Sequence, residues 1–163
     1  MNRDIMNLDA VNPNGRRTEL TPKLVDSLYV EAMVLADEAR SYFDMSARDE
    51  RDALDPLTRV GFACESLKVT TRLMHIIAWL LTQRAVSAGE ISRDEARTPD
   101  RRMGEAPRTD HLLALKFPDA ARLLIQQSEE LYDRCRRLDR IREEPGFEVS
   151  PARSLMSRLE RSL

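Results

Sequence analysis

The chain has 163 residues, of which 42% are apolar and 33% charged, and it contains only five glycines. This length suits one domain with a hydrophobic core and is short for two, and the composition favours helices with one apolar stripe and one charged face. The net charge of −2 provides no basic field that could neutralise phosphates, so binding to nucleic acid is not expected. We therefore expect an all-α protein with one domain.

Residues 1–20 are rich in Asn, Asp and Arg and contain the turn-forming run Pro13, Asn14 and Gly15, which indicates a flexible leader. This segment has no continuous apolar stretch of the kind that secretory signals carry, so a cytoplasmic protein is expected. The longest apolar run, Leu73–Leu81, has nine residues, whereas a helix that spans a bilayer needs about 20. No membrane span is predicted.

The first helix is predicted at about 21–46. Thr21 is a candidate N-cap, and Pro22 suits the first helical position, where its missing N–H costs nothing. Apolar residues then recur at spacings of three and four, which is typical of a helix with one buried seam. That seam consists of Val25, Leu28, Ala32, Leu35, Ala39 and Tyr42.

The second helix is predicted at about 56–88, because Asp55 and Pro56 repeat the same start signal and Gly89 supplies a stop. Two adjacent apolar stripes are expected to pack against two partner helices. The main stripe is Leu57, Val60, Cys64, Leu67, Thr71, Met74, Ala78, Leu81 and Ala85, and its neighbour is Ala63, Ser66, Thr70, Leu73, Ile77 and Leu80.

A third apolar line on this helix, formed by Phe62, Val69, Ile76 and Trp79, lies on another side. A bundle of three helices cannot easily bury all faces of one member, so we predict that these four residues form an exposed interface, most simply in a homodimer. The alternative is that the connector at 46–54, or the C-terminal piece, covers this line as a fourth helix.

Residues 89–117 are the least helical stretch. Ser92 and Glu95 fit a capping box that could open a short helix, but the following run TPDRRMGEAPRTD indicates a long mobile loop. The third helix is predicted at about 118–144, ending at the Pro145–Gly146 break, with a seam of Leu124, Ser128, Leu131, Cys135 and Leu138. Three long helices with connectors predict an antiparallel three-helix bundle over residues 21–144. Residues 145–163 form a flexible tail, in which Ser150 and Pro151 could start a short amphipathic helix.

No catalytic, metal or cofactor site is predicted. His75 lies in the apolar run LMHIIAWLL without a second ligand at i+3 or i+4, and His111 lies in the predicted loop. The apolar residues after His75 also disfavour a histidine phosphotransfer domain, and glycine-rich phosphate motifs are absent from the sequence. Cys64 and Cys135 are expected to be buried thiols. The arginines of the third helix suggest either a grip on an acidic partner or, more simply, local ion pairs with interleaved acids.

Three blocks of sequence carry a family resemblance. They are YVEAMVLADEARSYFD (Tyr29–Asp44), ESLKVTTRLMHIIAWLLTQRAVSAGEI (Glu65–Ile91) and QSEELYDRCRRLD (Gln127–Asp139). Together they resemble the RcdA family of alphaproteobacteria, whose name stands for regulator of CtrA degradation and which was long filed as a domain of unknown function. The resemblance spans all three predicted helices, about residues 24–142.

This resemblance implies a dimeric three-helix bundle without catalytic residues, which acts as an adaptor in cell-cycle proteolysis. Its implied role is to help deliver regulators such as CtrA to the ClpXP protease. The implied partners are the ClpX and ClpP proteins, response-regulator-like adaptors and substrate transcription factors. The alternatives from other classes are a helical small-molecule sensor, with a ligand near Met74, His75 and Trp79, and another signalling scaffold dimer.

Overall fold

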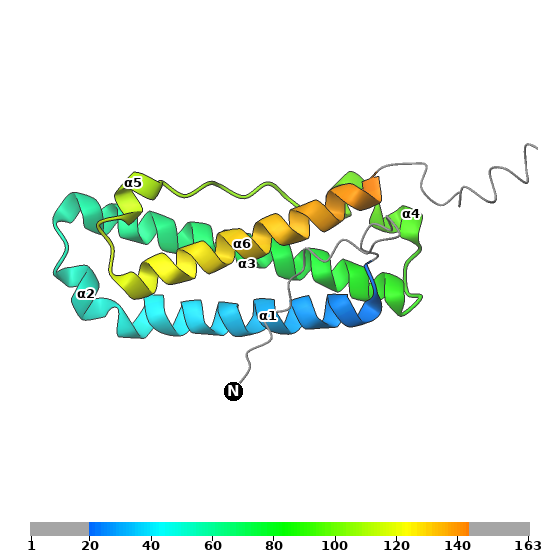
Figure 1. Cartoon of the computed structure of the whole chain (residues 1–163), viewed down its shortest axis with the longest axis horizontal. Coiled ribbons are helices and arrows are strands. Elements are labelled where there is room, and N and C mark those ends of the chain that lie inside the picture. The colour runs from blue at the N-terminus through cyan, green and yellow to red at the C-terminus, as the bar shows by residue number, and fades with distance from the viewer. Residues whose placement is uncertain (1–19, 144–163) are drawn as a thin grey trace, which may run out of the picture.

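The computed structural model describes residues 20–143, and the regular elements in that range are helices. The long ones are α1 (Pro22–Ser41), α3 (Pro56–Ser87) and α6 (Asp119–Glu143), which pack together as an elongated bundle (Figure 1). The predicted all-α class is thus confirmed. The predictions of a flexible leader and of a C-terminal tail with a short helix lie outside the described residues.

The starts of α1 and α3 are formed as their sequences predict. The side chain of Thr21 accepts a hydrogen bond from the backbone N–H of Leu24 at 3.2 Å, and the side chain of Asp55 accepts one from the N–H of Thr58 at 3.0 Å. Each cap is followed by a proline at the first helical position, where no intrahelical donor is lost. Helix α3 ends at Ser87, and Gly89 follows in the left-handed region with φ 74°.

The connector between α1 and α3 consists of two short helical pieces at one end of the bundle. The π-helix η1 (Tyr42–Ser46) continues α1, and α2 (Arg48–Asp52) then turns the chain toward α3 (Figure 1). The hydroxyl of Tyr42 donates to Oε2 of Glu50 at 3.1 Å and joins the two pieces. Beside it, Phe43, Phe62 and Phe117 stack edge to face with centroid distances of 5.4 Å, which closes this end of the core.

The core is built from one seam of each long helix. The α1 and α6 seams predicted from spacing are confirmed, except that Tyr42 and Leu138 are only half-buried. The buried apolar residues of the three helices include Val25, Leu28, Ala32, Leu35 and Ala39 from α1, Phe62, Val69, Leu73, Ile76, Trp79 and Leu80 from α3, and Leu124, Ile125, Leu131 and Cys135 from α6.

Helices α3 and α6 run in the same direction. Residues later in α3 contact residues later in α6. Arg72 contacts Ser128, and closer to the C-terminal ends Trp79 contacts Asp139. Figure 1 shows α1 antiparallel to both. The expected antiparallel arrangement is therefore correct for α1 against α3 and wrong for α3 against α6.

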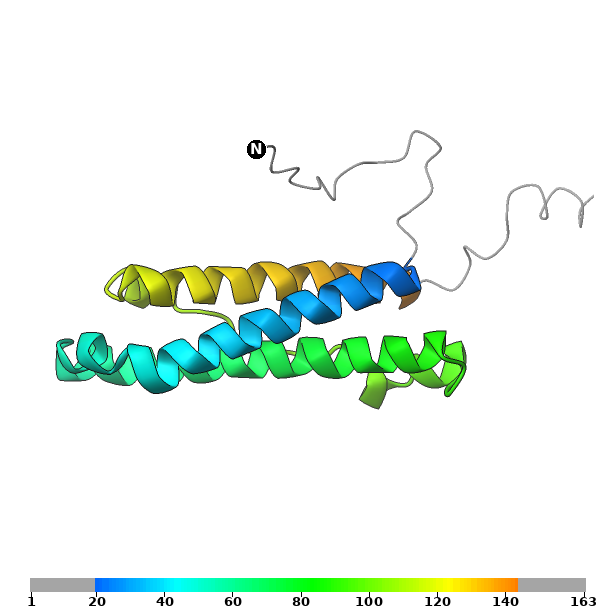
Figure 2. The same ribbon diagram turned by 90° about the horizontal axis from the view of Figure 1, so that it is seen from below.

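The parallel arrangement depends on residues 88–118, which return along the whole bundle. This segment contains α4 (Arg93–Ala96), η2 (Pro99–Arg101), an extended stretch at Arg102–Asp110 that we call the strap, and α5 (His111–Ala114). The strap lies against α3 and α6 on the side opposite α1 (Figures 1 and 2). The capping box that opens α4 is confirmed. The rest of the predicted loop packs onto the bundle, with Met103 and Thr109 buried.

Candidate protein-interaction surface

The four residues predicted to form an exposed interface lie in the interior. The exposed fractions are 2% for Phe62 and Trp79 and 0% for Val69 and Ile76, so none is available to a partner of the folded protomer. The prediction that they form an exposed line is wrong. Neither α2 nor a fourth helix is needed to cover them, because they are the α3 side of the core shared with α1 and α6.

The misassignment has a physical cause in the composition of the buried side of α3. Polar side chains interrupt that side and make it look solvated in the sequence, namely Thr58, Glu65, Arg72 and Gln83. Each of these is buried, and polar partners such as those of Thr58, Glu65 and Arg72 allow this burial. A continuous apolar line marks a face that meets another helix, without saying whether that helix belongs to the same chain.

The stripe predicted as the main core seam is instead the outer face of α3. The exposed fractions are 79% for Leu57, 67% for Leu67 and 66% for Met74. We call this face the exposed seam, defined as Leu57, Val60, Cys64, Leu67, Thr71, Met74, Ala78 and Leu81. Its spacings alternate strictly between three and four residues, which is the a and d pattern of a coiled coil. Over 24 steps of 1.5 Å it is roughly 36 Å long.

The exposed seam is nearly free of charge. The only acid of α3, Glu65, is buried, and the bases of the helix are engaged within the protomer. The guanidinium of Arg59 donates to two backbone carbonyl oxygens of the connector at 2.9 and 3.0 Å. Arg84 pairs with Asp26 at 3.2 Å and stacks over Tyr29. An apolar strip of this length on a protein surface is typical of a protein interface.

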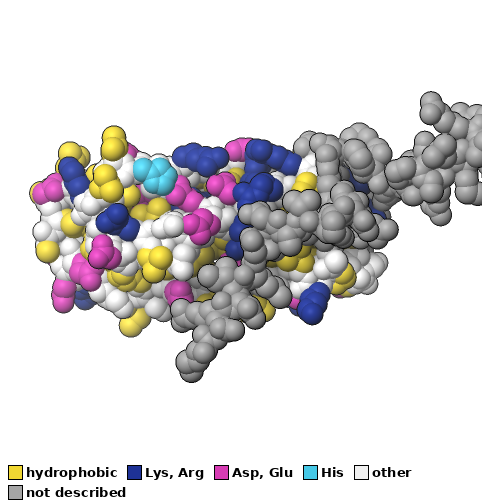
Figure 3. Space-filling model, in the orientation of Figure 1, with side chains coloured by type: hydrophobic (Ala, Val, Ile, Leu, Met, Phe, Trp, Pro, Cys, Tyr) yellow, Lys and Arg dark blue, Asp and Glu magenta, His cyan; other side chains and the backbone are white. Residues whose placement is uncertain are grey.

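A second group of exposed apolar side chains lies at the end of the bundle that carries η1, α2 and α5. It comprises Met45, Leu112 and Leu115. Figure 3 shows apolar side chains standing among charged ones at this end. Leu113 of α5 contacts Gly61 of α3, where an added Cβ would clash with the side chain of Leu113. Glycine at position 61 therefore lets α5 sit close to α3.

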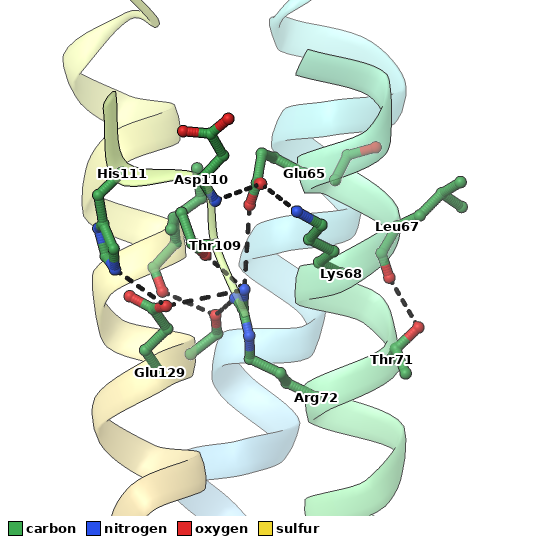
Figure 4. Close-up of polar contacts among 12 residues, drawn as sticks. Glu65, Leu67, Lys68, Thr71, Arg72, Thr109, Asp110, His111 and Glu129 are labelled. Carbon is green, nitrogen blue, oxygen red and sulfur yellow. Dashed lines mark hydrogen bonds and ion pairs between the residues drawn. The ribbon is translucent and has the colours of Figure 1, made fainter. Parts of the chain in front are cut away.

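A buried polar network joins α3, α6 and the strap (Figure 4). Arg72 is at its centre: Nη1 donates to Oγ of Ser128 at 2.7 Å, and Nη2 donates to Oγ1 of Thr109. The same guanidinium lies 3.9 Å from a carboxylate oxygen of Glu65 and 3.9 Å from one of Glu129. Burial lowers the pKa of Arg72, and these two carboxylates oppose that shift.

Glu65 connects the network to the start of α5. Its Oε1 accepts from Nζ of Lys68 at 2.7 Å and from the backbone N–H of Asp110 at 3.0 Å, while its Oε2 has no hydrogen-bond donor (Figure 4). Glu129 lies 3.4 Å from Nε2 of His111, whose side chain is exposed. These groups fasten the strap but form no nucleophile and base pair, and no cluster of His, Cys, Asp and Glu within residues 20–143 could hold a metal.

The other residues singled out in the sequence are dispersed. Met74 is exposed, Trp79 is buried and donates to Asp139, and His75 is half-buried against Gly104 of the strap, so the suggested ligand pocket near these three is not assembled. Cys135 is buried as expected, whereas Cys64 is exposed.

Two arginines of α6 pair with acids on other elements, whereas Arg122 pairs locally with Asp119 at 3.6 Å. Arg134 forms two hydrogen bonds with Glu31 of α1, at 2.7 and 2.9 Å, and Arg136 pairs with Glu105 of the strap. Arg134 and Glu31 lie in a groove of about 420 Å³ between α1 and α6. Spacing along one helix could not reveal these cross-element pairs.

Within residues 20–143, no helix has both the length and the apolar character needed to cross a bilayer. The described structure is a helical bundle with the strap packed along α3 and α6 on one side and an uncharged, mostly apolar face on α3. Over residues 16–163 the sequence matches the family described as Protein of unknown function (DUF1465), and the chain belongs to this family.

The crystal structure of RcdA from Caulobacter crescentus CB15 is similar to this chain, with 35% sequence identity and a TM-score of 0.60. The match covers 77% of this chain and 92% of that one. The predicted resemblance to the RcdA family is thus confirmed. No curated protein matches the chain.

Proposed function

We propose that this protein is a non-enzymatic, cytoplasmic adaptor of regulated proteolysis. It helps deliver cell-cycle regulators of the CtrA type to the ClpXP protease, together with response-regulator-like adaptors. Its membership of the RcdA family supports this role. The observation that carries the proposal is the exposed seam, because an uncharged apolar strip on a rigid helix serves protein contacts and offers no chemistry to a small substrate.

The seam also supports a homodimer. A helix with apolar residues at every a and d position packs best against a second helix of the same pattern, and most homo-oligomers are two-fold symmetric. Two copies of α3 meet this requirement except at Thr71, which is polar but uncharged. No like charges would face each other across the pair, because Arg59, Lys68 and Arg84 are held by partners in their own protomer. This proposal replaces the dimer through Phe62, Val69, Ile76 and Trp79, which are buried.

A reconstituted degradation assay tests the adaptor role. Purified ClpXP, a response-regulator-like adaptor and a CtrA-type substrate are combined with and without this protein, and substrate half-life is measured. We expect the wild-type chain to shorten the half-life several-fold and Leu67→Asp to abolish that effect. Leu123→Asp on α6 is the matched control, since Leu123 is also exposed and apolar but lies off the seam. An unchanged half-life with wild-type protein contradicts the proposal.

The C-terminal residues provide a second test of delivery. Because coupled folding and binding lets a tail contact several partners, we expect deletion of 147–163 to weaken substrate delivery. The described core ends before this deletion, so its melting transition is expected to stay nearly unchanged. Unimpaired delivery by the shortened chain would exclude the tail from this role.

A further inference from the structure

The strap is held in the way that a bound peptide is held. Its backbone is contacted by side chains of the two helices beneath it. Nη1 of Arg136 donates to the carbonyl oxygen of Met103 at 3.0 Å. The hydroxyl of Tyr132 donates to the carbonyl oxygen of Gly104 at 2.7 Å and accepts from the N–H of Ala106 at 3.0 Å. At the other end, Glu65 accepts from the N–H of Asp110. Hydrogen bonds to backbone groups depend little on which side chains the bound segment carries.

Every third side chain of the strap is turned toward the bundle and is buried or half-buried. Met103 and Thr109 are buried and Ala106 is half-buried, while Glu105, Pro107 and Arg108 are exposed. Three residues per turn is the period of a polyproline II helix, and the backbone of Arg102, with φ −75° and ψ 163°, is close to that conformation. Grooves that bind such segments read every third side chain and leave the others to solvent.

The contact beneath the strap is polar, which favours its reversible release. Only Met103 contributes a fully buried apolar side chain. The closed strap keeps the guanidinium of Arg72 away from water and leaves Oε2 of Glu65 without a hydrogen-bond donor. Hydration of these charges after release of the strap offsets part of the lost contact. Of the strap residues, only Met103 belongs to the buried apolar core, and Ala106 packs against that core.

We propose that the surface of α3 and α6 beneath the strap becomes a groove when the strap leaves and binds an extended segment of a protein partner there, and that the chain's own strap occupies this site until such a segment displaces it. The fitting segment carries an apolar residue, a small residue and a hydroxyl residue at successive spacings of three, as Met103, Ala106 and Thr109 do. This inference goes beyond the adaptor role, because it holds whatever the partner delivers. A tethered strap competes at an effective concentration near millimolar, so the closed protein binds a free peptide weakly.

The probe is a fluorescein-labelled peptide with the sequence of residues 101–111, and binding to the full chain is followed by anisotropy. In Met103→Asp the strap loses its apolar anchor while the groove keeps its residues. We expect this variant to bind the peptide at least about tenfold more tightly than wild type, since the tethered competitor is weakened. Arg108→Ser is the matched strap control, because Arg108 is exposed and makes only a distant ion pair with Asp133, at 3.7 Å. A peptide with Asp in place of its Met should bind neither variant.

A disulfide staple tests the same idea without opening the strap by mutation. A Cβ added at Gly104 would contact the imidazole ring of His75, so cysteines at these two positions would face each other between the strap and α3. For a disulfide to form, their Cβ atoms must approach to about 3.8 Å. In Gly104→Cys, His75→Cys, Cys64→Ser protein, oxidation should abolish peptide binding and reduction should restore it. Equal affinity in both states, or a folded Met103→Asp variant that binds no peptide, overturns the proposal. Neither result bears on whether the protein accelerates proteolysis.

Discussion

The indole N–H of Trp79 donates to Oδ1 of Asp139 at 2.9 Å and joins the C-terminal halves of α3 and α6. The same carboxylate is bound by the guanidinium of Arg102 at 2.9 and 3.0 Å. One buried acid thus connects both parallel helices to the start of the strap. Because the chain has a single tryptophan, the fluorescence of Trp79 reports directly on this junction.

Replacing Trp79 with Phe tests the worth of that contact. The variant removes the hydrogen-bond donor of Trp79 to Asp139, while the ion pair between Asp139 and Arg102 remains. We therefore expect a loss of about 1–3 kcal/mol in the free energy of unfolding. Urea denaturation followed by far-UV circular dichroism measures it. In a double-mutant cycle with Asp139→Asn, the two losses should be less than additive, and strict additivity would show that the bond contributes nothing.

Arg72 should be among the most sensitive positions of the bundle. Arg72→Met removes one of the two cations beside the buried carboxylate of Glu65 and takes the donor away from the hydroxyls of Ser128 and Thr109, so we expect a loss of about 3–5 kcal/mol. The double variant Glu65→Gln, Arg72→Met should regain part of this loss, because it also removes the buried negative charge that Lys68 alone would then balance. Arg97→Met, at an exposed ion pair, serves as the control and should change stability by less than about 0.5 kcal/mol. Equal losses at both arginines would contradict the role of the network.

Two positions on α3 separate its inner and outer faces. Ile76→Asp places a charge in the core and should unfold the protomer, whereas Met74→Asp changes an exposed side chain and should leave it folded. If the exposed seam holds the dimer, Met74→Asp sediments as a folded monomer at concentrations where wild type is a dimer. A dimer of undiminished strength would exclude the seam as that interface.

The two cysteines should differ sharply in reactivity. Burial raises the pKa of Cys135 to about 12, so its thiol stays protonated, while Cys64 is exposed on the seam. In a Met74→Asp background, in which the seam is not covered by a second copy, an aromatic disulfide reagent at pH 8 should modify one thiol per native chain and the second only after denaturation. Cys64→Ser should remove the fast reaction and Cys135→Ser should not.

The same raised pKa makes stability depend on alkaline pH. The unfolded thiol loses its proton near its ordinary value of 9.0 and the folded one only near 12, so the folded state holds the proton more tightly. The full stabilisation is present below pH 9 and declines above it, by about 1.4 kcal/mol per pH unit until pH 12. Denaturation at pH 8, 9.5 and 10.5 should show a shallower decline for Cys135→Ala than for wild type.

Local signals predicted the helices well, because their causes are local. Two helices start at a cap residue followed by proline, and the cap's hydrogen bond lies within four residues, at Thr21 for α1 and at Asp55 for α3. After the end of α3, Gly89 adopts the left-handed backbone conformation that favours glycine. The choice of buried face on α3 depended on distant partners. The burial of Arg72 is tolerated because its guanidinium donates hydrogen bonds to Ser128 and Thr109, and neither residue lies near Arg72 in sequence.

The direction of α6 relative to α3 could not be predicted from local sequence patterns either. Short connectors make neighbouring helices antiparallel, but residues 88–118 are numerous enough to run back along the bundle. The side chains that fasten this segment, such as Tyr132 and Arg136, look like ordinary surface residues of an amphipathic helix in the sequence. Only their contacts with Gly104 and Met103 show that they hold a strap.

The parallel pairing of α3 and α6 also affects synthesis of the chain on the ribosome. Trp79 is synthesised sixty residues before its hydrogen-bond partner Asp139. At a synthesis rate of about 5–20 residues per second, this separation corresponds to roughly 3–12 s. During that interval the nascent α1 and α3 can form a hairpin, but Leu73, Ile76 and Leu80 lack their α6 partners. The half-made protein therefore exposes apolar surface on both sides of α3, and it depends on rapid completion or on a chaperone to avoid aggregation.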